Sequence, residues 1–261
     1  MKRFIGLVVM TALLGCAPLA LAAGEEEAPR DFTFTLAPYA WLTGLYGTVG
    51  VGNKDVKVDA SFADLSKYLN FAAMIHADFM YRDKLGLLAE FNYSLLGDQA
   101  SHKSVSLDSQ MSLILSDVAG VYRLGTVALG GEGGNTASFD LTGGIRIWSL
   151  TTTLDVATAE NGGRTVSATK TWVDPTVGAR AFFHLGKRWE LDFRGGVGGF
   201  GLASNFTWDA MALAGYSLWD HGTILAGYRA VGVNHTEGSG ASKFTFDATL
   251  QGPILGLAFT F

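Results

Sequence analysis

The chain has 261 residues, a formal net charge of −5, 34 glycines and 5 prolines. Its acidic balance argues against a nucleic-acid partner, because binding to phosphates needs clustered Lys and Arg. Mean hydropathy is +0.24, yet no apolar run beyond the N-terminus reaches the roughly 20 residues that a membrane helix requires. If the protein enters a membrane, its apolar residues must therefore alternate with polar ones, as in a β-barrel.

The N-terminus predicts secretion. Residues 1–22 combine a basic start, an apolar stretch and small residues before the expected cleavage point, which is the composition of a signal peptide. We expect cleavage after Ala22, a short periplasmic arm over residues 23–30 and a barrel over residues 31–261.

The single cysteine, Cys16, admits two interpretations. It follows Leu13-Leu-Gly in a pattern that weakly resembles a lipoprotein signal, in which Cys16 would become the acylated first residue. Alternatively, it is an apolar residue of the signal peptide. We favour the second interpretation, under which the mature chain has no cysteine and forms no disulfide.

Alternating side chains fill the rest of the chain, and a period of two is typical of strands with one apolar face. The pattern is clearest over residues 172–185, where one face is wholly apolar and the other carries Asp174, Arg180 and His184. In chain order, the predicted strands cover residues 32–42, 71–81, 85–95, 104–124, 139–148, 172–185, 189–197, 206–218, 224–230 and 244–261.

The polar, Gly-rich stretch after the first strand predicts two smaller elements. Residues 48–51 and 56–58 can pair as a small hairpin around Gly52-Asn53, and residues 62–69 can form one short helix. Since hairpins with Gly-Asn turns are common between alternating segments, this hairpin could also join the barrel wall.

Two predicted strands break the alternation. The strand over 104–124 places Leu115 on the same face as Asp117, and the strand over 244–261 switches its apolar parity near Gly252-Pro253. A β-bulge adds one residue to a strand and so absorbs such a switch. We therefore expect a slip or bulge in each of the two strands.

The spacing of the strands predicts a transmembrane barrel. Short turns near 83–84, 186–188 and 220–222 alternate with longer loops over 49–70, 97–104, 155–169 and 235–243. Short periplasmic turns and long outer loops are typical of outer-membrane barrels with both termini in the periplasm. We predict an all-β fold, an antiparallel transmembrane β-barrel of about ten strands, with a range of roughly eight to twelve.

The predicted inward faces collect charged side chains. They are Asp78, Arg82, Glu90, Asp140, Arg146, Asp174, Arg180, Asp192, Arg194, Asp209 and Arg229. Because charges inside a narrow barrel must be paired or hydrated, two hypotheses follow: a narrow porin-like channel for small polar solutes, or a salt-bridged plug in a structural, closed barrel. Barrels of about eight strands are filled by side chains, whereas those of about sixteen hold water, so we favour the plug.

His76 is the candidate catalytic residue. It shares a face with Asp78 and lies across the predicted hairpin from Glu90 and Asn92, so it could act as a general base, with Ser94 as nucleophile. No motif of barrel lipases, lipid A deacylases or outer-membrane proteases accompanies it, and the short His-rich spacing of metal sites is lacking. We predict no catalytic residue, cofactor or metal, and keep a lipid- or peptide-modifying enzyme with His76 in its site as the alternative function.

The aromatic residues fall on two different faces of the predicted strands. Those near strand ends on the apolar faces predict the girdles of the two membrane interfaces: Tyr81, Tyr93, Trp189 and Trp208. The tryptophans of the opposite parity are expected in the lumen or at its rim: Trp41, Trp148, Trp172 and Trp219.

Several short motifs lie along the predicted strands and turns. They are Pro38-Tyr-Ala-Trp-Leu42, Ser61-Phe-Ala-Asp-Leu65, Trp172-Val-Asp-Pro175, Gly195-Gly-Val-Gly-Gly-Phe200, Asn205-Phe-Thr-Trp208, Gly227-Tyr-Arg229 and Gly252-Pro-Ile-Leu-Gly256. With them, the chain resembles a family of poorly characterised bacterial outer-membrane β-barrel proteins over nearly its whole mature length. Its last residues, with Phe259 and Phe261, resemble the membrane assembly signal of such barrels.

The resemblance implies a location in the bacterial outer membrane, with outer-membrane lipids and the barrel assembly machinery as partners. It implies no reaction and no solute. A third hypothesis, a soluble periplasmic β-protein, conflicts with the apolar outward faces, because they would form an exposed patch larger than monomers tolerate.

Overall fold

The computed structural model describes residues 31–52, 54–102, 105–130, 134–158 and 162–261. The predicted signal peptide with Cys16 and the predicted arm over 23–30 lie outside this part of the chain.

The described residues form mainly strands. These are β1 (Phe32–Trp41), β2 (Gly44–Val51), β3 (Lys54–Ala60), β4 (Leu69–Tyr81), β5 (Leu85–His102), β6 (Val105–Ala128), β7 (Thr136–Thr158), β8 (Gly162–Leu185), β9 (Trp189–Gly198), β10 (Phe206–Trp219), β11 (Gly222–Glu237) and β12 (Phe244–Thr260). The helices are α1 (Phe62–Leu65) and the 3-10 helix η1 (Gly240–Ser242). Within the described residues, no helix has the length and apolar character needed to cross a membrane.

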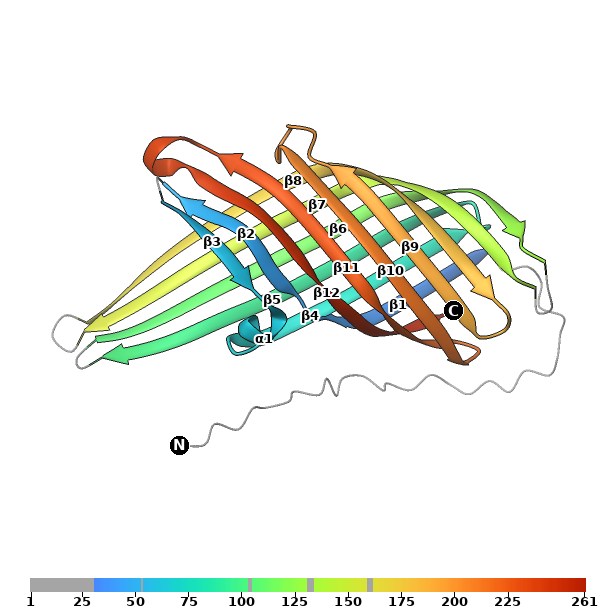
Figure 1. The fold of residues 1–261 in the computed structure, drawn as a ribbon, viewed down its shortest axis with the longest axis horizontal. Helices are drawn as coiled ribbons and strands as arrows, with labels where there is room; N and C mark the ends of the chain where they lie inside the picture. The colour runs from blue at the N-terminus through green and yellow to red at the C-terminus, as the bar shows by residue number, and fades with distance from the viewer. Residues whose placement is uncertain (1–30, 53, 103–104, 131–133, 159–161) are drawn as a thin grey trace. The chain divides into compact units, whose positions relative to one another are not determined.

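Ten of these strands close into an antiparallel barrel. The order β1-β4-β5-β6-β7-β8-β9-β10-β11-β12 is closed by the pairing of β1 with β12, from Thr35↔Thr260 to Trp41↔Ile254. β2 pairs with the first part of β12 and β3 pairs with β2, so this hairpin lies outside the closed ring (Figure 1). The predicted antiparallel barrel is confirmed, and the predicted 48–58 hairpin forms without joining the ring.

Two halves of the barrel differ in chemistry. The proximal half contains the start of β1, the end of β12 and the turns at 82–84, 186–188 and 220–221. The distal half contains β2, β3, α1 and the far ends of β5, β6, β7 and β8, which extend well beyond the other strands (Figure 1).

The extent of the distal strands corrects the loop prediction. Residues 97–104 and 155–169 were expected to be loops because they are polar, but β5 runs to His102, β7 to Thr158, and β8 begins at Gly162. The polar residues here form strand pairs in water, since hydroxyl groups of Thr151 and Thr169 meet across β7 and β8 at 2.9 Å. Polarity therefore marks where the strands leave the membrane, not where they end.

Neither strand has a bulge where the alternation was expected to slip; the register shift on β6 lies between Arg123 and Gly125, in the ladder with β7. The β5–β6 and β11–β12 ladders contain no register shift. On β6 the inward face passes directly from Leu115 to Asp117, both buried, and on β12 it continues through Gly252 to Ile254. The alternation keeps its phase, and only the chemistry of each face changes along the strand.

The outer surface of the proximal half is apolar. Its exposed large side chains include Phe34, Ile75, Phe79, Leu87, Phe91, Val118, Tyr122, Phe139, Leu141, Ile145, Val173, Val177, Phe193, Ile224, Tyr228, Leu255 and Leu257. Such a continuous belt exceeds what a soluble monomer exposes, but matches the lipid-facing band of a transmembrane barrel. On β7 the belt ends near Ile147, because the next outward residues are Ser149 and Thr151.

Candidate functional site

The proximal lumen holds a network of ionised side chains that we call the lumen charge network. Its members are Arg123, Arg146, Arg180, Arg194, Arg229, Asp78, Glu90, Asp117, Asp140, Asp192 and Asp209. They lie on inward faces because charge and lipid exposure are incompatible in the proximal half, where the outward positions face the membrane.

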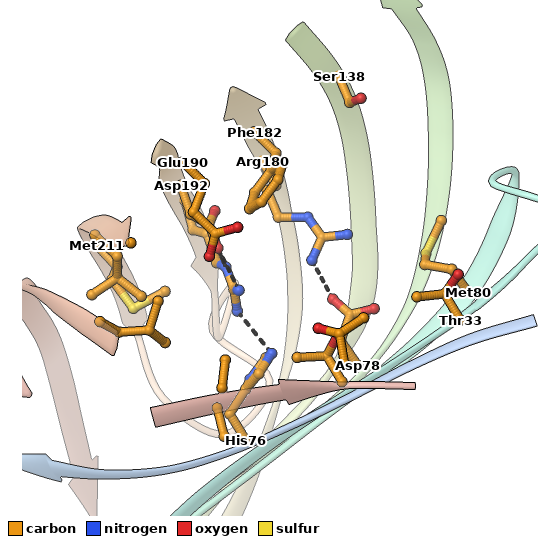
Figure 2. Close-up of a pocket in the computed structure, with 18 of the residues that line it drawn as sticks. Thr33, His76, Asp78, Met80, Ser138, Arg180, Phe182, Glu190, Asp192 and Met211 are labelled. Atoms are coloured by element: carbon orange, nitrogen blue, oxygen red, sulfur yellow. Dashed lines mark hydrogen bonds and ion pairs between the residues drawn. The ribbon is translucent and has the colours of Figure 1, made fainter. Parts of the chain in front are cut away.

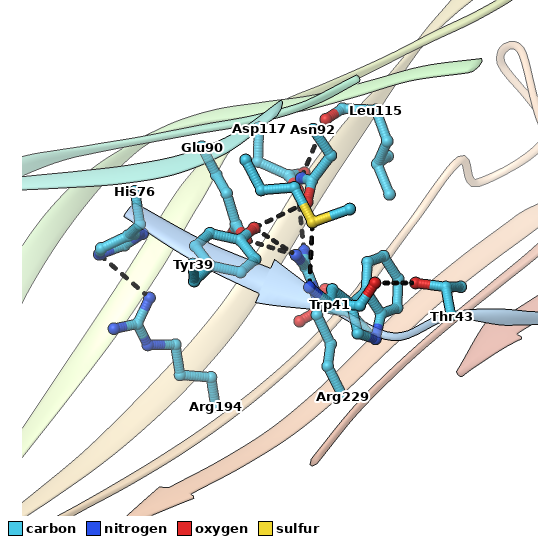
Figure 3. Close-up of polar contacts among 12 residues, drawn as sticks. Tyr39, Trp41, Thr43, His76, Glu90, Asn92, Leu115, Asp117, Arg194 and Arg229 are labelled. Atoms are coloured by element: carbon cyan, nitrogen blue, oxygen red, sulfur yellow. Dashed lines mark hydrogen bonds and ion pairs between the residues drawn. The ribbon is translucent and has the colours of Figure 1, made fainter. Parts of the chain in front are cut away.

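Arg229 on β11 forms the centre of the network (Figure 3). Its guanidinium group contacts the carboxylate of Glu90 on β5 and lies 3.4 Å from that of Asp117. The hydroxyl group of Tyr39 donates to Glu90 and lies 2.7 Å from the Asn92 Oδ1 atom. Because β12, β1 and β4 stand between β11 and β5 in the ring, this group spans the lumen.

Arg146 on β7 extends the network toward β10. Its Nε atom lies 2.7 Å from Asp117 and its second nitrogen 2.8 Å from Asp209. Arg146 and Arg229 therefore share Asp117, and both arginines are about 3% exposed. A buried charge with a removed partner is strongly destabilising, so each of these residues depends on the others.

A second group lies nearer the proximal end. Arg180 contacts Asp78 and lies 2.7 Å from Asp140, and Arg123 lies 2.8 Å from Asp140 and 3.0 Å from Asp83. Figure 2 shows Arg180 reaching from β8 toward Asp78 on β4. This group also joins strands that are not neighbours in the ring.

Arg194 on β9 also reaches across the lumen. It pairs with Asp192 on its own strand at 2.5 Å and lies 3.4 Å from the Nε2 atom of His76 on β4. Four strands separate β9 from β4 in each direction around the ring, so His76 and Arg194 face each other from opposite walls (Figure 3).

The distal lumen is apolar and aromatic. The rings of Trp148 and Trp172 stack at 5.8 Å, and His235 stacks on Trp172 at 4.2 Å. Asp174 accepts hydrogen bonds from the backbone and side chain of Ser204, each at 2.7 Å, which holds the β9–β10 loop against this cluster. Asp174 is therefore a buried anchor for a loop and stands apart from the lumen charge network.

Two cavities flank the centre of the network. One, of about 260 Å³, lies in the proximal lumen and includes His76 and Arg194 in its lining (Figure 2). The other, of about 230 Å³, lies in the distal half and is lined mainly by apolar side chains. Tyr39 lines both cavities, so its hydrogen-bonded group with Glu90 and Arg229 separates them.

The structure places all but one of the predicted charged residues on inward faces. Arg82 was expected in the lumen, but it lies in the 82–84 turn with φ +49° and pairs with exposed Asp31 at 2.8 Å. The left-handed backbone of the turn carries Arg82 out of the strand's alternation.

Sequence reasoning did not assign three residues of the site. Asp117 has the inward parity, but was attributed to a slipped strand; Arg123 lies close to a strand end; and Tyr39 was counted only as part of an alternating pattern. The parity of Asp117 was the available signal.

The predicted catalytic and aromatic residues are also distributed differently along the barrel. His76 pairs with Glu90, whereas Ser94 pairs with Ala72, so Asn92 lies between His76 and Ser94 on the inward face and the two do not form a dyad. Among the described residues, no group of three or more His, Cys, Asp or Glu side chains is arranged to hold a metal ion.

Of the tryptophans expected in the lumen or at its rim, Trp41, Trp148 and Trp172 are buried inside, whereas Trp219 is 53% exposed beside the proximal turn at 220–221. Trp189, predicted in a girdle, is 54% exposed at the proximal end.

The chain is similar to several solved structures. The crystal structure of the outer-membrane protease OmpT from Escherichia coli matches with a TM-score of 0.54 at 11% identity, over 88% of this chain and 97% of that chain. The translocator domain of the autotransporter NalP from Neisseria meningitidis matches with a TM-score of 0.37 at 11% identity, over 90% of each chain. Ail from Yersinia pestis, in complex with a heparin analogue, gives a TM-score of 0.37 at 11% identity, over 88% of this chain and 98% of that chain.

No protein-family model matches the chain, and no curated protein matches it in sequence. The likeness to OmpT shows the fold, at an identity that carries no residue roles. This fold and the apolar belt agree with the predicted location in the bacterial outer membrane.

Proposed function

We propose that the protein is a structural outer-membrane barrel with a closed lumen, and that it does not act as an open channel. The observation that carries this proposal is the contact of Arg229 with Glu90, which joins β11 to β5 through the middle of the lumen. An open channel needs a continuous aqueous path, and the barrel size of ten strands lies between filled and open examples.

The remaining lumen supports the same conclusion. Arg146 joins Asp117 to Asp209, and Arg194 meets His76 from the opposite wall. On the distal side, stacked Trp148 and Trp172 cover the network with apolar surface, which ions enter at a high desolvation cost. The partners of such a barrel are the outer-membrane lipids around its belt and the assembly machinery that reads the strand ending in Phe259 and Phe261.

Single-channel recording tests the proposal. Chain 23–261 is refolded, inserted into a planar lipid bilayer and checked for insertion by protection of the barrel from protease. The wild type is expected to give no discrete conductance steps, whereas Glu90→Ala combined with Arg229→Ala removes the central contact and is expected to give small ones.

A matched control removes an ion pair outside the lumen. Lys243 and Asp55 lie 3.4 Å apart with side chains 35% and 46% exposed, so the pair Lys243→Ala and Asp55→Ala is expected to stay as silent as the wild type. Discrete steps in the wild type that change when Arg146, Arg180 or Arg229 is neutralised would overturn the proposal in favour of a narrow channel for polar solutes.

A further inference from the structure

The wall of the barrel is interrupted beside β1. β1 pairs with β4 up to Pro38↔Ile75, and its continuation β2 pairs with β3 from Leu45↔Ala60 onward. Over residues 39–44, the described chain offers β12 as the strand partner on one side and no strand on the other.

Side chains satisfy the backbone at this interruption. The backbone N–H of Trp41 donates to the sulfur of Met74 at 3.1 Å, and the hydroxyl group of Thr43 donates to the carbonyl of Trp41 at 3.1 Å. Unpaired strand edges are a liability unless they are managed, so these contacts make the opening a stable part of the fold.

The short helix α1 lies in the connection across this opening, between β3 and β4 (Figure 1). Ser61 and Asp64 cap it reciprocally: the Ser61 hydroxyl accepts from the Asp64 backbone N–H at 3.3 Å, and the Asp64 carboxylate accepts from the Ser61 backbone N–H at 3.3 Å. The capping fixes Phe62 and Leu65, which both line the distal cavity. The Ser61-Phe-Ala-Asp-Leu65 motif thus builds one wall of the cavity.

The distal cavity behind the opening is uncharged. Its volume is about 230 Å³, and its inner lining includes Leu96, Met111, Leu113, Leu115, Leu150 and Leu250. Ligand sites are usually apolar with a few placed polar groups; here the lining includes the polar side chains of Tyr39, Thr43, Ser66, Asn92, Tyr93 and Ser94. The size and lining fit a narrow, flexible apolar ligand.

The apolar outer belt extends as far as the opening. On the outer face of β4, the apolar side chains Phe71, Ile75 and Phe79 are exposed by 51%, 39% and 36%. Phe71 lies four positions beyond the last β1–β4 pair, beside the interruption. Because the apolar belt continues to this level on β4, the opening lies beside the part of the surface that faces lipid acyl chains in a transmembrane barrel.

One residue of the cavity lining carries a buried donor that lacks an acceptor. Trp41 lines the cavity and is 4% exposed, and its Nε1 atom finds no hydrogen-bond partner among the described residues. An unsatisfied buried donor is unfavourable, and an oxygen atom of a ligand would satisfy it.

The geometry points to a binding site for a single alkyl chain with a carbonyl oxygen, as in a fatty acid or a lipid ester. The alkyl chain occupies the distal cavity through the opening between β1–β2 and β4, and Trp41 donates to the oxygen. The closed centre of the lumen prevents passage to the proximal side, so the site holds the chain and does not conduct it.

Photocrosslinking tests this site in the full barrel. Chain 23–261 in phosphatidylcholine vesicles is exposed to two probes in separate arms: a free fatty acid with a mid-chain diazirine, and a phosphatidylcholine with the same diazirine in one acyl chain. Label on peptides containing Met111 and Leu113 supports the site. Label from both probes identifies membrane lipid as a source, and label from the fatty acid alone identifies a free amphiphile.

Two controls separate the cavity from the belt. Leu113→Trp fills the cavity and is expected to lose the cavity label, whereas Val177→Trp on the lipid-facing side is expected to keep it. Excess unlabelled dodecanoic acid is expected to remove the cavity label from the wild type, and to remove less of it from Trp41→Phe. Label confined to belt residues such as Ile145, or a cavity label that dodecanoic acid leaves unchanged in the wild type, overturns the proposal whether or not Leu113→Trp folds.

Discussion

The proximal and distal halves of this barrel have opposite chemistry on the same strands. On β7, Arg146 points into the lumen and Ile147 points to the membrane, but one step further Trp148 points inward and Ser149 outward. The proximal half has an apolar outer surface and a charged interior, as in a transmembrane barrel. The distal half has a polar outer surface and an apolar core, as in a water-soluble barrel. The environment outside each half selects the outward residues, and the lumen takes the complementary set.

The comparison predicts that the two interiors fail differently when they are altered. The proximal interior is held by directional contacts between charges, for which the loss of one partner leaves the other unpaired and buried. The distal interior is held by packing, for which the loss of a side chain leaves a cavity. Paired substitutions should therefore rescue the first interior and not the second.

The largest effect is expected from Glu90→Ala. Arg229, which is 3% exposed, would lose its main carboxylate, and the free energy of unfolding should fall by about 3–5 kcal/mol. Urea unfolding in lipid vesicles measures it. The double variant Glu90→Leu with Arg229→Met should recover most of the loss, because an apolar pair of similar volume needs no counter-charge. A loss below about 1 kcal/mol for Glu90→Ala would show that water, and not Arg229, compensates the charges.

A somewhat smaller effect is expected from Leu115→Ala in the distal core. Leu115 is 1% exposed, and removal of a buried leucine side chain costs about 2–5 kcal/mol through lost transfer energy and the remaining cavity. Leu115→Met, with a similar volume, should cost less than about 1.5 kcal/mol. If Leu115→Ala were as mild as Leu115→Met, the distal half would be a loosely packed vestibule and not a core.

The outer surfaces offer a direct contrast. Val177 is 52% exposed on the belt, so Val177→Arg should lower the free energy of unfolding in bilayers by about 2–4 kcal/mol. Thr151 lies beyond the belt in contact with Thr169, and Thr151→Arg should change the same quantity by less than about 0.5 kcal/mol. Equal costs at both positions would mean that the bilayer extends over the distal strands.

The two halves also explain why part of the structure could be predicted from the sequence. Period-two alternation is a local property, so the strands and their inward and outward faces follow from neighbouring residues. The same rule explains the error on β6: Leu115 and Asp117 share the inward face, and the change from apolar to charged was attributed to a slip. A strand that leaves the membrane changes both faces at once without changing phase.

Other features depend on contacts between distant parts of the chain. The meeting of Arg194 with His76 follows from the closure of the ring by β1 and β12, which no local pattern encodes. The exit of β2 and β3 from the ring is similar, since the segment over 44–60 has the alternation of a wall strand. The chain pairs with β4 along β1 but with β3 along its continuation β2, and this change of neighbour places the hairpin outside the ring.

The smallest effect is expected at the capping residue of α1, in the distal half. Ser61→Ala removes the side chain that accepts from the Asp64 backbone N–H, and loss of such a cap costs about 1 kcal/mol. Because α1 is a single turn in a connection, the cost should appear as faster hydrogen exchange at Leu65 and Ser66, with global unfolding nearly unchanged. Ser66→Ala, which loses only a contact to the Ala63 carbonyl, serves as the control. If Ser61→Ala lowered global stability as much as Leu115→Ala, α1 would belong to the cooperative distal core and would not unfold locally.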